Sequence, residues 1–153
     1  MERQTFGSLR NFSMNTKSQL PKRQKNQTTI WLDNIDNDLI SKPICFEVFS
    51  TKRPLKHESE MTSGRCWKFF DEFPCVGAIW YIYNNFEAVA HECVHLAHHI
   101  AGLKMIKVSQ RMRESYNDNG HWIYSREEKV CQISGILIDK INLQHYLKYN
   151  KHV

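Results

Sequence analysis

Residues 77–102 read GAIWYIYNNFEAVAHECVHLAHHIAG and decide the fold, because they join the clearest strand of the chain to its clearest helix. Residues 77–83 are rich in aromatic and β-branched side chains, which is typical of a strand. Asn84 or Asn85 can cap a helix, the residues that follow favour helix, and Gly102 is a typical C-terminal stop. The sequence therefore predicts a strand that leads directly into a helix.

Apolar residues cover much of the circumference of this predicted helix. They are Phe86, Val89, Ala90, Cys93, Val94, Ala97, Ile100 and Ala101. A helix with so broad an apolar surface is expected to be largely buried, together with its histidines and its central glutamate. Buried polar groups need a partner. A metal ion is the simplest one, and a core helix with hydrogen-bonded histidines is the alternative.

The helix contains the pattern H-E-x-x-H, as His91-Glu92-Cys93-Val94-His95. Residues i and i+4 lie on one face of a helix, so both imidazoles can bind one Zn²⁺. Glu92 lies beside them and can take a proton from a metal-bound water, as in zinc metallopeptidases. The pattern predicts Zn²⁺ as the cofactor, His91 and His95 as metal ligands, and Glu92 as the catalytic general base.

A catalytic zinc usually has three protein ligands and one open position. The candidates for the third ligand are Glu127, Glu128, His98, His99, His121 and His145. His98 and His99 lie about one turn beyond His95, roughly 5 Å along the helix axis, so we expect them to be surface or supporting groups. A second, antiparallel helix closes the site better. Residues 125–137 predict one, with Ser125 as N-cap and Glu128 completing a capping box.

The rest of the chain predicts one α+β domain. Its 153 residues suit a single domain. Residues 1–28 are polar and predict a flexible N-terminal tail, which leaves residues 29–153 for the domain. Further strands are expected at residues 44–49 and 66–70, a strand or short helix in residues 28–39, and a final helix at residues 141–149. We expect a small sheet of three or four strands against two or three helices.

Charge and cysteine content exclude several classes of function. The net charge of +5 is mild and forms no basic stripe, which argues against nucleic acid as a partner. The five cysteines form no C-x-x-C pair, and no signal peptide is visible, which favours reduced thiols and a cytoplasmic location. No apolar run is long enough to span a membrane. The sequence does not specify an oligomeric state.

Residues 77–137 resemble small gluzincin-type zinc metallopeptidase-like proteins, of the kind found in bacteriophages. Those proteins have an aromatic strand, an A-H-E-x-x-H helix, a variable loop, and a helix that opens E-E-x-x-A-Y-x-x-G-x-L. This chain has AHECVH at residues 90–95 and EEKVCQISGIL at residues 127–137. The second pattern matches at Cys131, Gly135 and Leu137, whereas Gln132 replaces the usual aromatic.

The resemblance implies a zincin-like fold, with a small, mostly antiparallel sheet packed on the H-E-x-x-H helix and a second ligand-bearing helix. It implies that Glu128 is the third zinc ligand, with Glu127 as the fallback. The activity implied is that of a hydrolase, a metalloprotease that cleaves a peptide or protein substrate, in the host cytoplasm if the protein is viral. The strand at residues 77–83 can offer an exposed edge to an extended peptide. His121 and Tyr124, in or near the loop before the second helix, are candidate transition-state stabilisers, as is Tyr116.

A non-catalytic zincin-fold protein that binds a host or partner protein is the main alternative. The intact Glu92 argues against it, because a structural zinc needs no general base. A deformylase-like hydrolase takes a cysteine ligand from an E-G-C-L-S stretch, which this sequence lacks. DNA-associated metalloproteases of the SprT type use a third histidine and often a zinc ribbon, and no ribbon is present.

Overall fold

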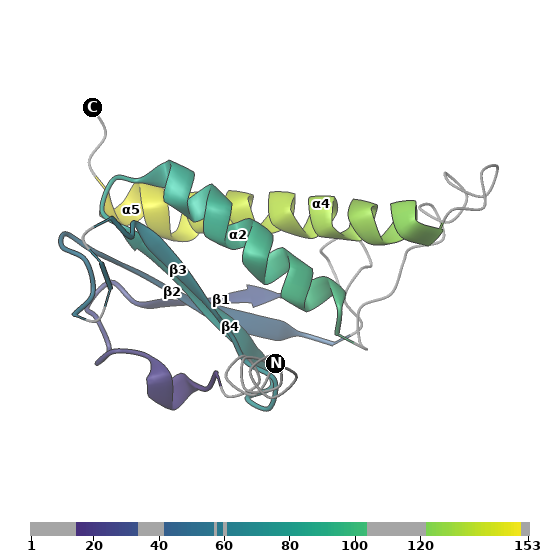
Figure 1. The fold of residues 1–153 in the computed structure, drawn as a ribbon, viewed down its shortest axis with the longest axis horizontal. Helices are drawn as coiled ribbons and strands as arrows, with labels where there is room; N and C mark the ends of the chain where they lie inside the picture. Colours follow the sequence, from purple (N-terminus) through teal and green to yellow (C-terminus); the bar gives the residue numbers. More distant parts are fainter. Residues whose placement is uncertain (1–14, 34–41, 57, 60, 104–121, 151–153) are drawn as a thin grey trace, which may run out of the picture.

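The computed structural model describes residues 15–33, 42–56, 58–59, 61–103 and 122–150. These residues form an α+β fold in which the long helices lie on one face of a sheet and the segment that precedes the first strand lies on the other (Figure 1). The coarse class expected from the sequence is thus confirmed. Residues 1–14 of the expected tail, and residues 104–121 with Tyr116 and His121, lie outside the described residues.

Four strands form one mixed sheet in the order β1-β2-β4-β3. They are β1 (Thr28–Leu32), β2 (Ile44–Thr51), β3 (Gly64–Lys68) and β4 (Cys75–Ile82). β1 pairs antiparallel with β2, β2 pairs parallel with β4, and β4 pairs antiparallel with β3. Two of the three pairings are therefore antiparallel. Both edges of β4 are hydrogen-bonded, so the exposed edge expected for residues 77–83 is wrong, and β3 is the edge strand on that side.

The strand-to-helix junction forms as the sequence predicts. Asn84 adopts a positive φ of 66°, a left-handed conformation that asparagine tolerates better than most residues. The side chain of Asn85 then accepts a hydrogen bond from the backbone N–H of Ala88 at 3.0 Å. This cap starts α2 (Phe86–Ala101), which ends at Gly102.

The second long helix, α4 (Trp122–Ile141), extends beyond both ends of the range predicted for it. It continues through the π-helical turn η2 (Asn142–Tyr146) into the short α5 (Leu147–Tyr149), where a final helix is expected.

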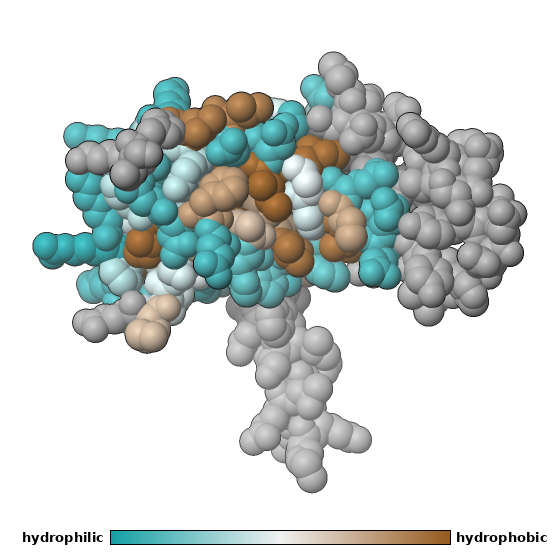
Figure 2. Space-filling view, turned by 90° about the horizontal axis from the view of Figure 1, so that it is seen from above, coloured by the Kyte–Doolittle hydropathy of each residue, from teal (hydrophilic) through white to brown (hydrophobic). Residues whose placement is uncertain are grey.

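Figure 2 shows the molecule from the helix side. Hydrophobic and hydrophilic side chains are mixed on this surface. No helix in the described ranges is both long and apolar enough to cross a membrane.

Hydrophobic packing covers both faces of the sheet. The helix face joins strand residues such as Ile79 to Leu96 of α2 and Leu137 of α4. The opposite face holds a second cluster that includes Phe49, Trp67 and Trp80 and that Leu20 covers in part. β2 and β4 are buried along nearly their whole length, which explains why β4 is a continuous apolar run and β2 is mostly apolar rather than alternating.

Residues 15–27 pack against the sheet, although the sequence assigns them to a tail. The 3₁₀ turn η1 (Lys17–Gln19) precedes Leu20, which contacts the second cluster. Farther along, Arg23 and Gln27 donate hydrogen bonds to the buried carboxylate of Glu47, at 3.3 Å and 3.1 Å. This part of the N-terminal segment therefore belongs to the folded body, while the domain boundary itself stays a prediction.

A buried hydrogen-bond network joins the N-terminal segment to the C-terminal helix. The fully buried His145 donates from Nε2 to the carbonyl oxygen of Asn26 at 2.8 Å, so its Nδ1 accepts from the Tyr81 hydroxyl at 2.6 Å. Asn150 Nδ2 donates to the same hydroxyl oxygen at 2.9 Å. Burial lowers the pKa of His145 to about 4, which keeps the ring neutral. Both ring nitrogens are engaged, so His145 is not available as a metal ligand.

α2 lies close against the sheet at its β3 edge. A Cβ on Gly77 would lie 2.8 Å from Leu96 Cδ1 and 2.4 Å from the carbonyl oxygen of Trp67. Only glycine leaves room for this approach. The close contact holds α2 over β3 and β4, and so sets the side chains of α2 beside the edge strand.

Candidate metal centre

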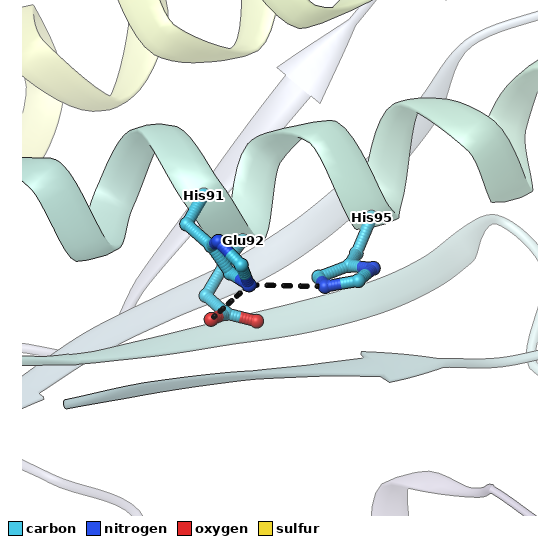
Figure 3. A group of neighbouring side chains, drawn as sticks. All are labelled: His91, Glu92 and His95. Carbon is cyan, nitrogen blue, oxygen red and sulfur yellow. Dashed lines mark hydrogen bonds and ion pairs between the residues drawn. The ribbon is translucent and has the colours of Figure 1, made fainter. Parts of the chain in front are cut away.

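His91, Glu92 and His95 come together on one side of α2, as Figure 3 shows. The Nε2 atoms of the two histidines lie 3.2 Å apart. A carboxylate oxygen of Glu92 lies 4.0 Å from His91 Nε2. Among the described residues, these three form the group of histidine, cysteine and carboxylate side chains that can hold a metal ion.

The spacing of the two histidines fits a tetrahedral zinc site. Two nitrogens that are each about 2.05 Å from a tetrahedral Zn²⁺ lie about 3.3 Å apart. The observed separation of 3.2 Å is within a tenth of an ångström or so of that value. Burial, and then the nearby His91, lower the pKa of His95, which favours the neutral imidazole that binds metals. The two Nε2 atoms, which share a hydrogen bond in this structure, thus have a separation that a zinc ion could bridge.

Glu92 differs from its neighbours because it is buried, with 7% of its surface exposed. Its burial raises the pKa of the carboxyl group, an effect that His91 opposes and Glu58 reinforces. A general base works best when its pKa approaches the operating pH. A buried carboxylate beside two imidazoles can therefore accept a proton more readily than an exposed glutamate.

Gly64, the first residue of β3, supports the Glu92 side chain directly. A Cβ at Gly64 would lie 3.0 Å from Glu92 Cγ, 3.1 Å from Glu92 Oε2 and 3.2 Å from the carbonyl oxygen of Trp80. The edge strand thus approaches the carboxylate as closely as a backbone without a side chain allows. A side chain at position 64 would therefore displace the Glu92 side chain from its place beside the two histidines.

A cleft runs between α2 and β3, and its two lobes share Gly64, His91 and Glu92. The first lobe, near the start of α2, encloses about 400 Å³, and its other lining residues are Thr62, Ser63, Asn85, Glu87 and Ala88. The second lobe encloses about 480 Å³, and its other lining residues are Asn15, Arg65, Cys66, Lys68 and His95. His91 and Glu92 therefore lie where the two lobes meet, and His95 lies on the second lobe.

The sequence misjudged how deeply the histidines are buried. The His91 side chain is 68% exposed and His95 is also exposed, whereas both were expected inside the core. The reason is that α2 packs on the sheet and on α4 through one face only, and Val94 also lies outside that face. Burial of these histidines therefore does not call for a metal ion. Their 3.2 Å spacing is the feature that favours one.

The remaining histidines of α2 have other positions. His98 is exposed. His99 is buried and donates from Nε2 to the carbonyl oxygen of Phe69 at 2.9 Å, with its ring against Phe70. Both placements agree with the expectation that these residues are surface or supporting groups rather than ligands.

The other predicted site residues lie on or before α4. Glu127 is exposed and Glu128 is half-buried, and neither is part of the His91–Glu92–His95 group. Their role as third ligand stays a prediction. His121 and the side chain of Tyr124 lie outside the described residues. The same holds for the other residues of 104–121.

The β3 residues of the cleft were missed at the level of sequence. Gly64, Cys66 and Lys68 alternate along the strand on the side toward α2. Burial raises the pKa of the Cys66 thiol to about 12, so this side chain forms a neutral wall of the cleft. The sequence showed a strand here, but it contained no signal that this strand pairs with β4 beside the helix.

Comparison with known proteins identifies no relative: no family model matches the chain, and no curated protein or solved structure is detectably similar.

Proposed function

We propose that this chain is a zinc-dependent metallopeptidase with a zincin-like fold. The observation that carries the proposal is the 3.2 Å separation of His91 Nε2 and His95 Nε2 beside the buried carboxylate of Glu92. The arrangement provides two nitrogen ligands and a base in one turn of helix, at the floor of a cleft.

Each of these residues has a distinct part in the proposed reaction. His91 and His95 hold the metal through Nε2. A zinc ion held there would supply Lewis acidity toward the substrate carbonyl and toward water. Glu92 accepts the proton of the attacking water and passes it to the departing amine. The neutral Gly64 backbone keeps the Glu92 carboxylate in place for both transfers.

The edge strand provides a means of binding a peptide. Among the described residues β3 pairs with β4 alone, so its other edge has no strand partner there and can accept an extended chain. Addition of a strand to such an edge uses main-chain hydrogen bonds and aligns the peptide with α2. We propose this edge, rather than that of β4, as the substrate platform.

Glu128 completes the proposed site as the third zinc ligand, with Glu127 as the fallback. Both residues lie on α4, which packs against α2. The assignment rests on the resemblance to gluzincin-type proteins of bacteriophages, which also supports action in the host cytoplasm and a stabilising role for His121 or Tyr124. Glu128 is not part of the His91–Glu92–His95 group, so the proposal requires that it approach the two histidines when the metal binds.

Zinc content and peptide hydrolysis test the proposal together. After purification with zinc, we expect one equivalent of metal in the wild type and in Glu92→Gln, and loss of metal in His95→Ala and Glu128→Ala. Glu127→Ala tests the fallback: loss of metal there, with retention in Glu128→Ala, would make Glu127 the third ligand. Hydrolysis of a peptide mixture is expected in the wild type and should fall about 100-fold or more in Glu92→Gln, since a general base contributes about 10²–10⁴. A wild type that binds no zinc contradicts the proposal.

A non-catalytic zincin-fold protein that acts by binding another protein is the second candidate. The exposure of His91 and His95 supports it, because exposed histidines can persist without a metal. It predicts that Glu92→Gln leaves partner binding unchanged and that the wild type hydrolyses no peptide. Measurement of hydrolysis in the zinc-loaded wild type separates the two candidates.

A further inference from the structure

The two lobes of the cleft differ in charge. Apart from the shared Glu92, the charged residue that lines the first lobe is Glu87, an exposed carboxylate in the first turn of α2. The charged residues that line the second lobe are Arg65 and Lys68. A substrate that lies along the cleft therefore meets negative charge on one side of the candidate metal centre and positive charge on the other.

Arg65 is already engaged. Its guanidinium pairs with Glu58 at 2.8 Å and lies over the Trp67 ring, 4.8 Å from the ring centroid. Both contacts hold the guanidinium group of Arg65 against Glu58 and the Trp67 ring. The ion pair also neutralises most of that charge, so Arg65 is poorly suited to bind a substrate anion.

Lys68, unlike Arg65, forms no ion pair within the described ranges: no carboxylate there pairs with its ammonium group. It lies at the end of β3, on the lobe that His95 also lines, and its positive charge contributes to lowering the pKa of both His95 and His99. Among the described residues, Lys68 therefore presents a positive charge without an ion-pair partner on the His95 side of the candidate metal centre.

We propose that Lys68 determines specificity, by selecting substrates that carry a carboxylate on the His95 side of the bond to be cleaved. The reaction in this inference rests on the proposed peptidase function, whereas the binding preference rests on the cleft alone. An aspartate or glutamate side chain and a free C-terminal carboxylate offer the same charge. Both are recognised by a lysine as a point charge, without a fixed bidentate geometry.

The test uses synthetic peptides of one length with acidic, amide or neutral side chains at each position, each made with a free and with an amidated C-terminus. Cleavage rates identify the preferred peptide, and the amidated set separates a side chain from a terminus. The variants are Lys68→Glu and Lys68→Arg. Lys25→Glu is the matched control, because it changes the net charge equally at an exposed position that does not line the cleft.

We expect the zinc-loaded wild type to prefer the carboxylate peptide about fivefold in kcat/KM, the size of a partly exposed ion pair. Lys68→Glu should abolish or reverse the preference, while Lys68→Arg and Lys25→Glu should retain it. Equal rates for acidic and amide peptides, or an unchanged preference in Lys68→Glu, overturn the inference even when the peptides are cleaved.

Binding of the same peptides to zinc-loaded Glu92→Gln gives a readout that does not need turnover. If the wild type cleaves nothing but Glu92→Gln binds the carboxylate peptide about fivefold more tightly, and Lys68→Glu removes that difference, the peptidase proposal fails and the selectivity stands. Absence of both cleavage and carboxylate-dependent binding overturns the inference.

Discussion

Replacement of Gly64 by alanine tests whether the edge strand positions Glu92, the proposed catalytic carboxylate. The added Cβ would lie 3.0 Å from Glu92 Cγ and 3.2 Å from the Trp80 carbonyl oxygen, both closer than an ordinary van der Waals contact. The backbone oxygen is held in the sheet, so the Glu92 side chain must move by a few tenths of an ångström. Small overpacking of this kind costs about 1 kcal/mol of folding free energy, and a misplacement approaching 1 Å costs up to about 100-fold in rate.

We therefore expect Gly64→Ala to lower kcat about tenfold or more, with its zinc content unchanged because neither histidine is displaced. Its melting temperature should fall by about 3–5 °C. Gly135→Ala is the matched control. A Cβ there meets nothing within 4 Å on an exposed turn of α4, so alanine should leave activity intact and stabilise the helix by about 0.5–1 kcal/mol.

The comparison is measured by peptide hydrolysis, zinc analysis and thermal unfolding of both variants. A Gly64→Ala protein that equals Gly135→Ala in kcat and in stability would show that Glu92 is not held by the edge strand. Loss of zinc from Gly64→Ala would instead show that the substitution disturbs the histidines, and would also refute the reasoning.

Two further predictions concern stability. The pKa of His145 is lowered from 6.5 to about 4 in the fold, so the unfolded chain binds more protons and stability should fall as the pH drops from 6.5 to 4, by about 3 kcal/mol at 1.4 kcal/mol per pKa unit. Urea unfolding over this range should show a steeper loss in the wild type than in His145→Gln, and parallel pH profiles would contradict the assignment. Leu96→Ala should cost about 3 kcal/mol, because the fully buried side chain fills the contact between α2 and Gly77 and leaves a cavity. A loss below about 1 kcal/mol in urea unfolding would mean that α2 shifts to close the gap.

Local structure was readable from the sequence wherever neighbouring residues determine it. The strand at residues 77–83, the cap at Asn85 and the end of the helix at Gly102 follow from side-chain propensity and from hydrogen bonds within a few residues. The H-E-x-x-H spacing placed His91 and His95 on one face for the same reason, since the period of the helix is fixed by its backbone. Both features needed no knowledge of the rest of the chain.

Pairing and burial depend on residues far apart in sequence, and the sequence was less informative there. It placed β4 at an edge, whereas β2 and β3 pair on its two sides, because hydrogen bonding between strands is decided by the whole sheet. It also placed the histidines in the core, since an apolar helix does not reveal which of its faces finds a partner. The buried role of His145 likewise depends on Asn26 and Tyr81, which are distant in the chain.

The sequence by itself determined the candidate ligands and base, because a helix converts a spacing of four residues into a shared face without help from other elements. Only the tertiary structure decided that Gly64 lies close to Glu92, that Lys68 lines the same cleft, and that Glu128 is not part of the His91–Glu92–His95 group. Those relations arise where an edge strand meets a helix. Their physical origin is the close packing that Gly77 allows between α2 and the sheet, which local sequence cannot encode.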